Sequence, residues 1–167
     1  FTPLVEVFSI DEAWLDVTGC EGLFGDSVTI AHKIQEAIRT ELDLSCSIGV
    51  SSNKLLAKMA SDLKKPNAIT VLSADDVPRM LWPLPVDKLF GVGSRMAEHL
   101  NLMNIKTIGD LARVPQELLE GVFGLNGRYL HLWANGIDTS TVDPHAGEDA
   151  KSMGHSITLP KDITSYE

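Results

Sequence analysis

Long apolar runs, cysteines and basic side chains are all scarce in this chain of 167 residues. No window approaches the roughly 20 consecutive apolar residues that span a bilayer, and no basic stretch followed by an apolar one opens the chain as a secretory signal would. These absences predict a protein with no membrane partner. Its two cysteines, Cys20 and Cys46, have neither the spacing of a metal site nor the density of a disulfide scaffold. They predict free thiols and a reducing, cytoplasmic setting.

The shortage of basic residues bears on nucleic acid. Lys and Arg total 14 against 23 Asp and Glu, which leaves a formal net charge of −9. Non-specific affinity for DNA comes mainly from basic side chains that neutralise phosphates. No large segment of the chain is basic overall, so any contact with nucleic acid must come from local geometry.

The first part of the chain alternates strand-like and helix-like patterns. Four apolar runs predict short strands, at residues 4–10, 13–17, 46–50 and 68–72. Apolar residues at helical spacing predict two helices between them, the first capped by Ser27 and the second by Ser51 or Ser52. The alternation predicts an α+β domain over residues 1–72, in which a mixed sheet is covered on one face by two helices.

The strand signal ends after Leu72. Prolines and glycines then punctuate short helical patterns, which predicts a small all-helical domain over residues 73–139. Residues 140–152 have almost no apolar content and read as a linker. A lone strand-like run follows within residues 153–167, and a lone strand is not stable by itself. We therefore expect it to open a further, truncated domain, and the start at Phe1 inside a strand-like run is typical of an excised fragment.

The acidic pair Asp11 and Glu12 stands where the first two predicted strands meet. Magnesium in phosphate chemistry is usually held by one or two carboxylates together with substrate phosphates. Adjacent strand residues point to opposite faces, so both carboxylates reach one ion cluster only if the backbone turns there. Without further information, a solvated turn is the alternative interpretation.

Four groups of residues resemble, in chain order, motifs of Y-family (translesion) DNA polymerases, including the bacterial types IV and V. They are Ser9-Ile-Asp-Glu-Ala13 followed by Asp16, the stretch from Ser47-Ile-Gly-Val-Ser51 to Lys65-Pro66-Asn67, Gly91-Val-Gly93, and Gly154-His-Ser-Ile-Thr-Leu-Pro160. The resemblance implies part of a metal-binding palm, a whole thumb and the first strand of a little-finger domain. One departure is Ala68, where the family often has glycine.

The resemblance also implies roles for individual residues. Asp11 would bridge two Mg²⁺ ions, and Glu12 would bind the ion that activates the primer 3′-hydroxyl. Lys65 would contact the triphosphate of a deoxynucleoside triphosphate. For Lys65 and its neighbours Lys54, Lys58 and Lys64, a solvated helix face is the competing interpretation. A third carboxylate and the fingers would precede Phe1, so the fragment itself is expected to be inactive.

The stretch from Leu89 to Glu98 has the form of a helix-hairpin-helix element. The glycines of Gly91-Val92-Gly93 let the backbone approach a phosphate, and the N–H groups at the start of the next helix attract the anion without any lysine. Ser94 and Arg95 extend the same contact surface for primer–template DNA. Leu100, Leu102, Ile108 and Leu111 are expected to form the core of this domain.

The function that follows is Mg²⁺-dependent nucleotidyl transfer in translesion synthesis. Two alternatives stay open: a non-catalytic, polymerase-like module that binds DNA and recruits other proteins, and another palm enzyme such as a nucleotide cyclase. The family implies a sliding clamp as a partner, although these residues contain no convincing clamp-binding segment. An unpaired palm edge would favour pairing with a second copy, which predicts a homodimer of the isolated chain.

Overall fold

The computed structural model describes residues 1–147, 154, 156–159 and 161. The strand region, as we call residues 1–72, contains four strands and three helices. They are β1 (Val5–Ser9), β2 (Glu12–Leu15), α1 (Glu21–Phe24), α2 (Ser27–Leu42), β3 (Ile48–Val50), α3 (Lys54–Leu63) and β4 (Ile69–Val71). Strands β1 and β2 form an antiparallel hairpin, and β3 and β4 pair in parallel.

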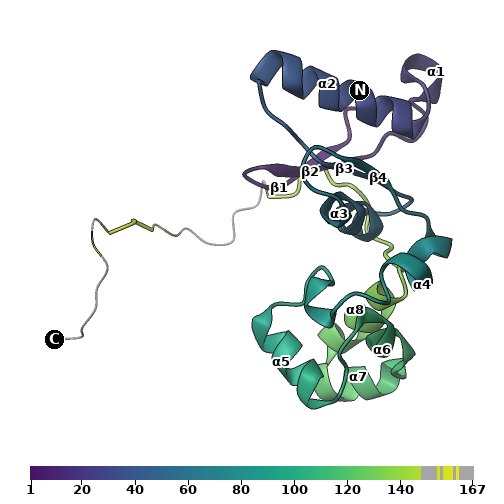
Figure 1. Ribbon diagram of the computed structural model, residues 1–167, viewed down its shortest axis with the longest axis vertical. Helices are drawn as coiled ribbons and strands as arrows, with labels where there is room; N and C mark the ends of the chain where they lie inside the picture. The colour runs from purple at the N-terminus through teal and green to yellow at the C-terminus, as the bar shows by residue number, and fades with distance from the viewer. Residues whose placement is uncertain (148–153, 155, 160, 162–167) are drawn as a thin grey trace.

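This arrangement differs in two respects from the expected sheet. The four strands form two separate two-stranded sheets, and α2 and α3 lie on opposite sides of them (Figure 1). Gly49 explains the position of α3, because a Cβ there would stand 1.8 Å from the carbonyl oxygen of Ala57. The backbone of α3 therefore packs directly on β3, and the alternation of the strand turns Ile48 and Val50 toward the other side.

Both long helices of the strand region begin at a side-chain cap, one or two residues from the expected serines. The Asp26 carboxylate accepts a hydrogen bond from the Thr29 amide at 2.7 Å, and Asn53 Oδ1 accepts one from the Leu56 amide at 2.8 Å. The cap is thus Asp26 rather than Ser27, and Asn53 rather than Ser51 or Ser52. All are residue types that cap helices, so composition alone does not choose between neighbours.

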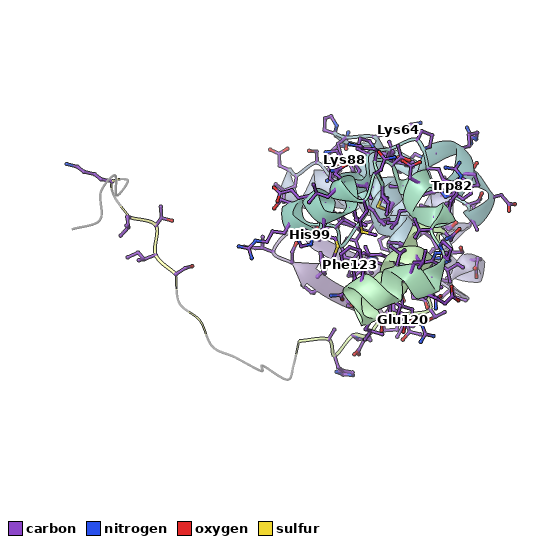
Figure 2. All side chains as sticks on the ribbon, turned by 90° about the horizontal axis from the view of Figure 1, so that it is seen from below. Lys64, Trp82, Lys88, His99, Glu120 and Phe123 are labelled. Atoms are coloured by element: carbon purple, nitrogen blue, oxygen red, sulfur yellow. The ribbon has the colours of Figure 1, made fainter. Side chains whose placement is uncertain are left out.

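The helical region, as we call residues 73–139, begins immediately after β4. It consists of η1 (Ala74–Asp76), α4 (Val77–Met80), η2 (Val86–Lys88), α5 (Ser94–Leu102), α6 (Ile108–Arg113), α7 (Gln116–Phe123) and α8 (Leu125–Ala134). Trp82 donates its indole N–H to the Ala134 carbonyl at 3.0 Å, which ties α8 to the loop after α4. Figure 2 looks at the molecule from below and shows Trp82 and Phe123 among these helices.

One continuous core runs from α3 through the helical region. Leu100, Ile108 and Leu111 are fully buried in it, as expected, whereas Leu102 is 86% exposed. The expectation for Leu102 was wrong because residues two positions apart on a helix point about 200° from one another. With Leu100 turned inward at the end of α5, Leu102 is turned to solvent.

The chain returns from α8 to the strand region (Figure 1). Asn53 Nδ2 donates to the Gly136 carbonyl at 2.9 Å, and the Leu55 amide donates to Asp138 Oδ2 at 3.0 Å. The last residues of the helical region are therefore attached to the start of α3. The strand expected within residues 153–160 lies partly outside the described residues, and residues 154 and 156–159 have no regular secondary structure.

The state of the two cysteines and the apolar character of the helices were both expected from composition. Cys20 and Cys46 are both free, and burial raises the pKa of the Cys46 thiol. In the part of the chain that the structure describes, none of the helices combines the length and apolar character needed to cross a membrane.

Candidate functional site

A groove of about 750 Å³ lies between the two sheets. Strands β1 and β2 form one wall and β3 the other, while α2 and α3 contribute the remaining sides. Asp11, Glu12 and Lys65 all line this groove. The structure thus brings together the three residues that the sequence singled out for metal and triphosphate binding, although Lys65 is distant from the acids along the chain.

The β1–β2 hairpin departs from regular strand geometry close to the two adjacent acids. Its register is irregular between Val7 and Ser9, so the strict alternation of side chains is interrupted just before Asp11. Asp11 is exposed and its Oδ1 accepts a hydrogen bond from Ser9 Oγ at 2.9 Å. Glu12 is half-buried on the first residue of β2. Both residues line the same groove.

A row of alternating charges connects Glu12 to Lys65, which both line the groove. Lys58 Nζ lies 2.5 Å from Glu12 Oε1 and 3.1 Å from Asp62 Oδ2. Asp62 Oδ1 in turn lies 2.7 Å from Lys65 Nζ. The Lys58 side chain is only 15% exposed, so the interpretation of the lysines as a solvated helix face is wrong for this residue.

These contacts stabilise the charged forms of Lys58 and Asp62. Burial alone would lower the pKa of Lys58, but the hydrogen bonds with Glu12 and Asp62 outweigh it and raise that pKa above its ordinary value. Burial alone would raise the pKa of Asp62, but the hydrogen bonds from Lys65 and Lys58 lower it. Lys58 and Asp62 therefore keep opposite charges close to Glu12 and Lys65.

The donor set fits a hard divalent cation with an incomplete protein shell. Asp11 and Glu12 supply carboxylate oxygens, which are the ligands that Mg²⁺ prefers. Among the described residues, no group of three His, Cys, Asp or Glu side chains is placed to hold a metal ion. Two carboxylates completed by substrate phosphates are the usual arrangement for Mg²⁺ at phosphate sites, so the residues present are compatible with such an ion.

The turn before α5 has two glycines with different surroundings. Gly91 has φ of +84°, and a Cβ there would lie 2.5 Å from Trp133 Cζ3, so both the backbone and the packing require glycine. Gly93 is the N-cap of α5 with an ordinary φ of −80°, and a Cβ on it would meet no atom within 4 Å. Among the residues that the structure describes, no side chain caps the first turn of α5, and Ser94 and Arg95 are exposed beside it.

Residues 1–62 match the model of the impB/mucB/samB family, and residues 87–138 match the model described as the thumb domain of DNA polymerase-iota. DNA polymerase IV of Moorella thermoacetica is 54% identical over 167 residues, and that of Pelotomaculum thermopropionicum is 55% identical over 166 residues. The chain belongs to the Y family of DNA polymerases.

The two DNA polymerase IV sequences match 100% and 99% of this chain, which spans 42% and 41% of their own lengths. Solved structures show the same fold. DinB from Sulfolobus solfataricus is 32% identical, with a TM-score of 0.72 over 86% of this chain and 42% of that one. A Dbh ternary complex is 34% identical, with a TM-score of 0.73 over 86% of this chain and 43% of that one. These matches confirm the expected fold class, a partial α+β palm followed by a helical thumb.

The departure at Ala68 from the usual Y-family glycine has no visible cost. The residue with positive φ in this loop is Asn67, at 52°, and asparagine is one of the residue types that tolerates the left-handed region. Ala68 accepts a hydrogen bond from the Ile48 amide at 2.8 Å as the chain enters β4. Alanine thus satisfies the same backbone without strain.

Sequence reasoning included Asp62 and Lys58 in the stretch that resembles the family, but it gave Asp62 no role and Lys58 no partner. The spacing of Lys58 and Asp62 within one helix turn was a local signal for their pairing. Nothing local indicated that Lys58 would meet Glu12, because these residues come from different elements and are brought together only by the packing of α3 on the hairpin.

Proposed function

We propose that this chain carries part of the catalytic palm and the thumb of a DNA-directed DNA polymerase that performs template-directed nucleotidyl transfer. In this reaction a DNA primer hydroxyl attacks the α-phosphate of a deoxynucleoside triphosphate, and pyrophosphate leaves. Translesion synthesis, the copying of damaged template bases, is the corresponding task in a bacterial cytoplasm. The observation that supports it best is the convergence of Asp11, Glu12 and Lys65 on one groove.

The acidic and basic residues of the groove would have different roles. Asp11 and Glu12 would hold Mg²⁺, which supplies charge neutralisation and alignment of the reacting oxygens and phosphate when bound. Lys65 would bind the triphosphate at the other end of the row of charges. Lys58 and Asp62 would keep Glu12 and Lys65 oriented toward the groove, because each forms an ion pair with one of them.

The turn from Gly91 to Arg95 would bind the phosphate backbone of the primer–template duplex. In the described part of the chain, the amides at the start of α5 are not capped by a side chain, and no atom would lie within 4 Å of a Cβ on Gly93. Such amides bind an anion without neutralising it by a lysine, which suits a chain with a net charge of −9.

The two alternative functions are less well supported. A recruitment module would have no physical need for two carboxylates and a lysine that line one groove. A nucleotide cyclase would have no need for a helical domain that matches a polymerase thumb model.

Primer extension by the full-length protein tests the catalytic assignment. We expect Asp11→Asn to abolish extension with Mg²⁺ while duplex binding is unchanged, because the substitution removes charge from the metal site and leaves the thumb intact. The matched control is Asp75→Asn, at an exposed carboxylate on η1. Extension by Asp11→Asn at the wild-type rate would show that this carboxylate has no part in the reaction.

Gly93→Ser tests the DNA contact in the 167-residue chain. Serine is a good N-cap residue and the fold has room for it, so the melting temperature should not fall. The hydroxyl would occupy the amides that we assign to the phosphate, so duplex affinity should fall. Gly121→Ser in α7, where a Cβ also meets nothing within 4 Å, should leave affinity unchanged. Equal affinity of Gly93→Ser and wild type would exclude this turn as the contact.

The affinity itself should be low. We expect non-specific duplex binding by the isolated chain no tighter than about 10⁻⁴ to 10⁻⁶ M, with a log–log salt slope of about −0.9 for each phosphate neutralised. Nanomolar affinity would contradict a contact built mainly from amides.

Self-association of the isolated chain stays a prediction. Strands β1 and β3 each pair with one neighbour in the described structure, and unpaired edges are templates for another strand. Light scattering that finds only monomer over a wide concentration range would rule out the homodimer.

A further inference from the structure

Aromatic side chains join the helical region to the hairpin that carries the acidic pair. The ring of Phe90 lies 5.6 Å from that of Phe8 on β1 and 6.2 Å from that of Trp14 on β2, measured between centroids. The centroid of the Phe90 ring also lies 6.0 Å from that of Trp133 in α8. All three separations are within the range of favourable aromatic contact.

Phe90 lies next to the turn before α5 and contacts both α3 and the acidic hairpin. It immediately precedes Gly91, which packs against Trp133, and its own amide lies 3.3 Å from Met59 Sδ in α3. Phe8 stands on the strand that leads into Asp11, and Trp14 stands on the strand that leads away from Glu12. The side chain immediately before the proposed DNA-binding turn thus contacts both strands of the acidic hairpin.

The surface that receives Phe90 is itself held in place. Trp14 donates its indole N–H to the Lys54 carbonyl at 3.0 Å, and Lys54 Nζ lies 4.6 Å from the centre of the same ring. Lys54 Nζ also lies 2.6 Å from both carboxylate oxygens of Glu6 on β1, with side-chain exposures of 14% and 11% for the two residues. Through Lys54, helix α3 therefore contacts both strands of the hairpin.

The exit of the helical region is attached at the same point. Glu6 Oε2 accepts a hydrogen bond from the Asp143 amide at 2.8 Å, and Lys54 Nζ donates to the Thr141 carbonyl at 3.3 Å. The helical region is consequently held on the hairpin at its DNA-binding turn and again where the chain leaves it.

We propose that Phe90 is a positioning residue that sets the distance between the DNA-phosphate turn and the Asp11–Glu12 pair. The inference rests on the proposed function and deepens it. A primer end is in place for transfer only if the duplex is held at a constant distance from the acids, and a misplacement of about 1 Å can lower the rate about 100-fold. Phe90 keeps this distance constant because it adjoins the turn and its ring contacts Phe8 and Trp14 of the acidic hairpin.

Spin-label distance measurements on the 167-residue chain test the proposal without DNA or nucleotide. The labels go on Ile10→Cys, at a fully exposed position beside the acids, and on Glu98→Cys, at an exposed position of α5. Cys20→Ser and Cys46→Ser remove the native thiols. We expect a single narrow distance distribution in this background, loss of the narrow peak in Phe90→Ala, and a partial loss in Phe90→Leu, which keeps apolar volume but no ring.

Phe123→Ala is the matched control, because Phe123 packs against the core within the helical region (Figure 2). It should lower the melting temperature and keep the narrow peak. An unchanged peak in Phe90→Ala, or equal broadening in Phe123→Ala, would overturn the proposal. Should Phe90→Ala lose its helical circular dichroism, Phe90→Leu decides by the same criterion. The polymerisation and duplex-binding assays are independent of this measurement, so failure of the proposed function would be recognised separately.

Discussion

The helical region and the β1–β2/α2 part of the strand region bury their apolar side chains to very different extents. Leu81, Leu100, Ile108, Leu111 and Leu119 are completely buried. On the hairpin, Val7 is 68% exposed and Phe8 48% exposed, because the groove separates it from β3. The comparison indicates that the apolar burial that stabilises the fold is concentrated in the helical region and α3. The groove, in contrast, is an open space lined in part by charged side chains.

Truncation of a core leucine should show the largest difference between the two regions. Leu111→Ala leaves a cavity in a closed core, so we expect a loss of about 2–5 kcal/mol in the free energy of unfolding. Leu15→Ala, at a side chain that is 39% exposed on β2, should cost clearly less. Urea unfolding of both variants measures the difference, and equal losses would refute the contrast.

Gly49 marks a place where two elements of the strand region, β3 and α3, are tightly packed. Gly49→Ala places a Cβ against the backbone of α3, so we expect a loss of at least about 1–3 kcal/mol. Gly121→Ala in α7 meets open space and should be neutral or stabilising by about 0.5–1 kcal/mol, because alanine favours a helix. Thermal unfolding of the two variants measures the difference in stability. A Gly49→Ala variant as stable as the wild type would show that α3 can move away from β3.

A local cap should matter less than the core. Thr107 Oγ1 accepts a hydrogen bond from the Asp110 amide at 3.0 Å, and the Asp110 carboxylate accepts one from the Thr107 amide at 2.9 Å. Thr107→Ala should cost about 1 kcal/mol, whereas Thr107→Ser should cost much less because it keeps the hydroxyl. Chemical denaturation of the two variants checks this. A loss as large as that of Leu111→Ala would mean that α6 depends on its cap more than on its packing.

The smallest effect expected is an acid dependence at the junction of the two regions. Hydrogen bonds from Arg79 and Ser73 lower the pKa of Asp76 from 3.8 to about 2. Folding therefore favours the ionised carboxylate, and its contribution is present above about pH 4 and lost as the pH falls toward 2. Melting temperatures of wild type and Asp76→Asn should converge over this interval. A difference that stays constant down to pH 2 would contradict the assigned pKa.

Sequence patterns predicted the elements better than their arrangement. The strands on either side of Asp11 and Glu12, the two helices after them and the helical region are present near their expected positions. The division into two sheets and the opposite placement of α2 and α3 were not predicted, because hydrophobic periodicity identifies which face of an element is buried and not which partner buries it. Leu102 shows the same limit at the end of a helix, where an apolar residue need not be turned inward.

The candidate site was predicted in part. The resemblance singled out Asp11, Glu12 and Lys65, and the structure places all three on the groove. It gave no role to Lys58 and Asp62, which connect Glu12 to Lys65, or to Phe90, which contacts the hairpin from the helical region. These contacts depend on how α3 and the turn before α5 pack against β1 and β2.

The sequence by itself determined the family, the order of the elements and the residue types that begin helices and allow close approach, such as the polar residues before α3 and Gly49. Each of these acts through neighbours within a few residues or through a residue type with few substitutes. Only the tertiary structure decided that Glu12 meets Lys58, that Glu6 meets Lys54 and that Phe90 meets Phe8 and Trp14. The physical reason is that such pairs come from distant parts of the chain, and their contact energy is gained only after packing has brought the elements together.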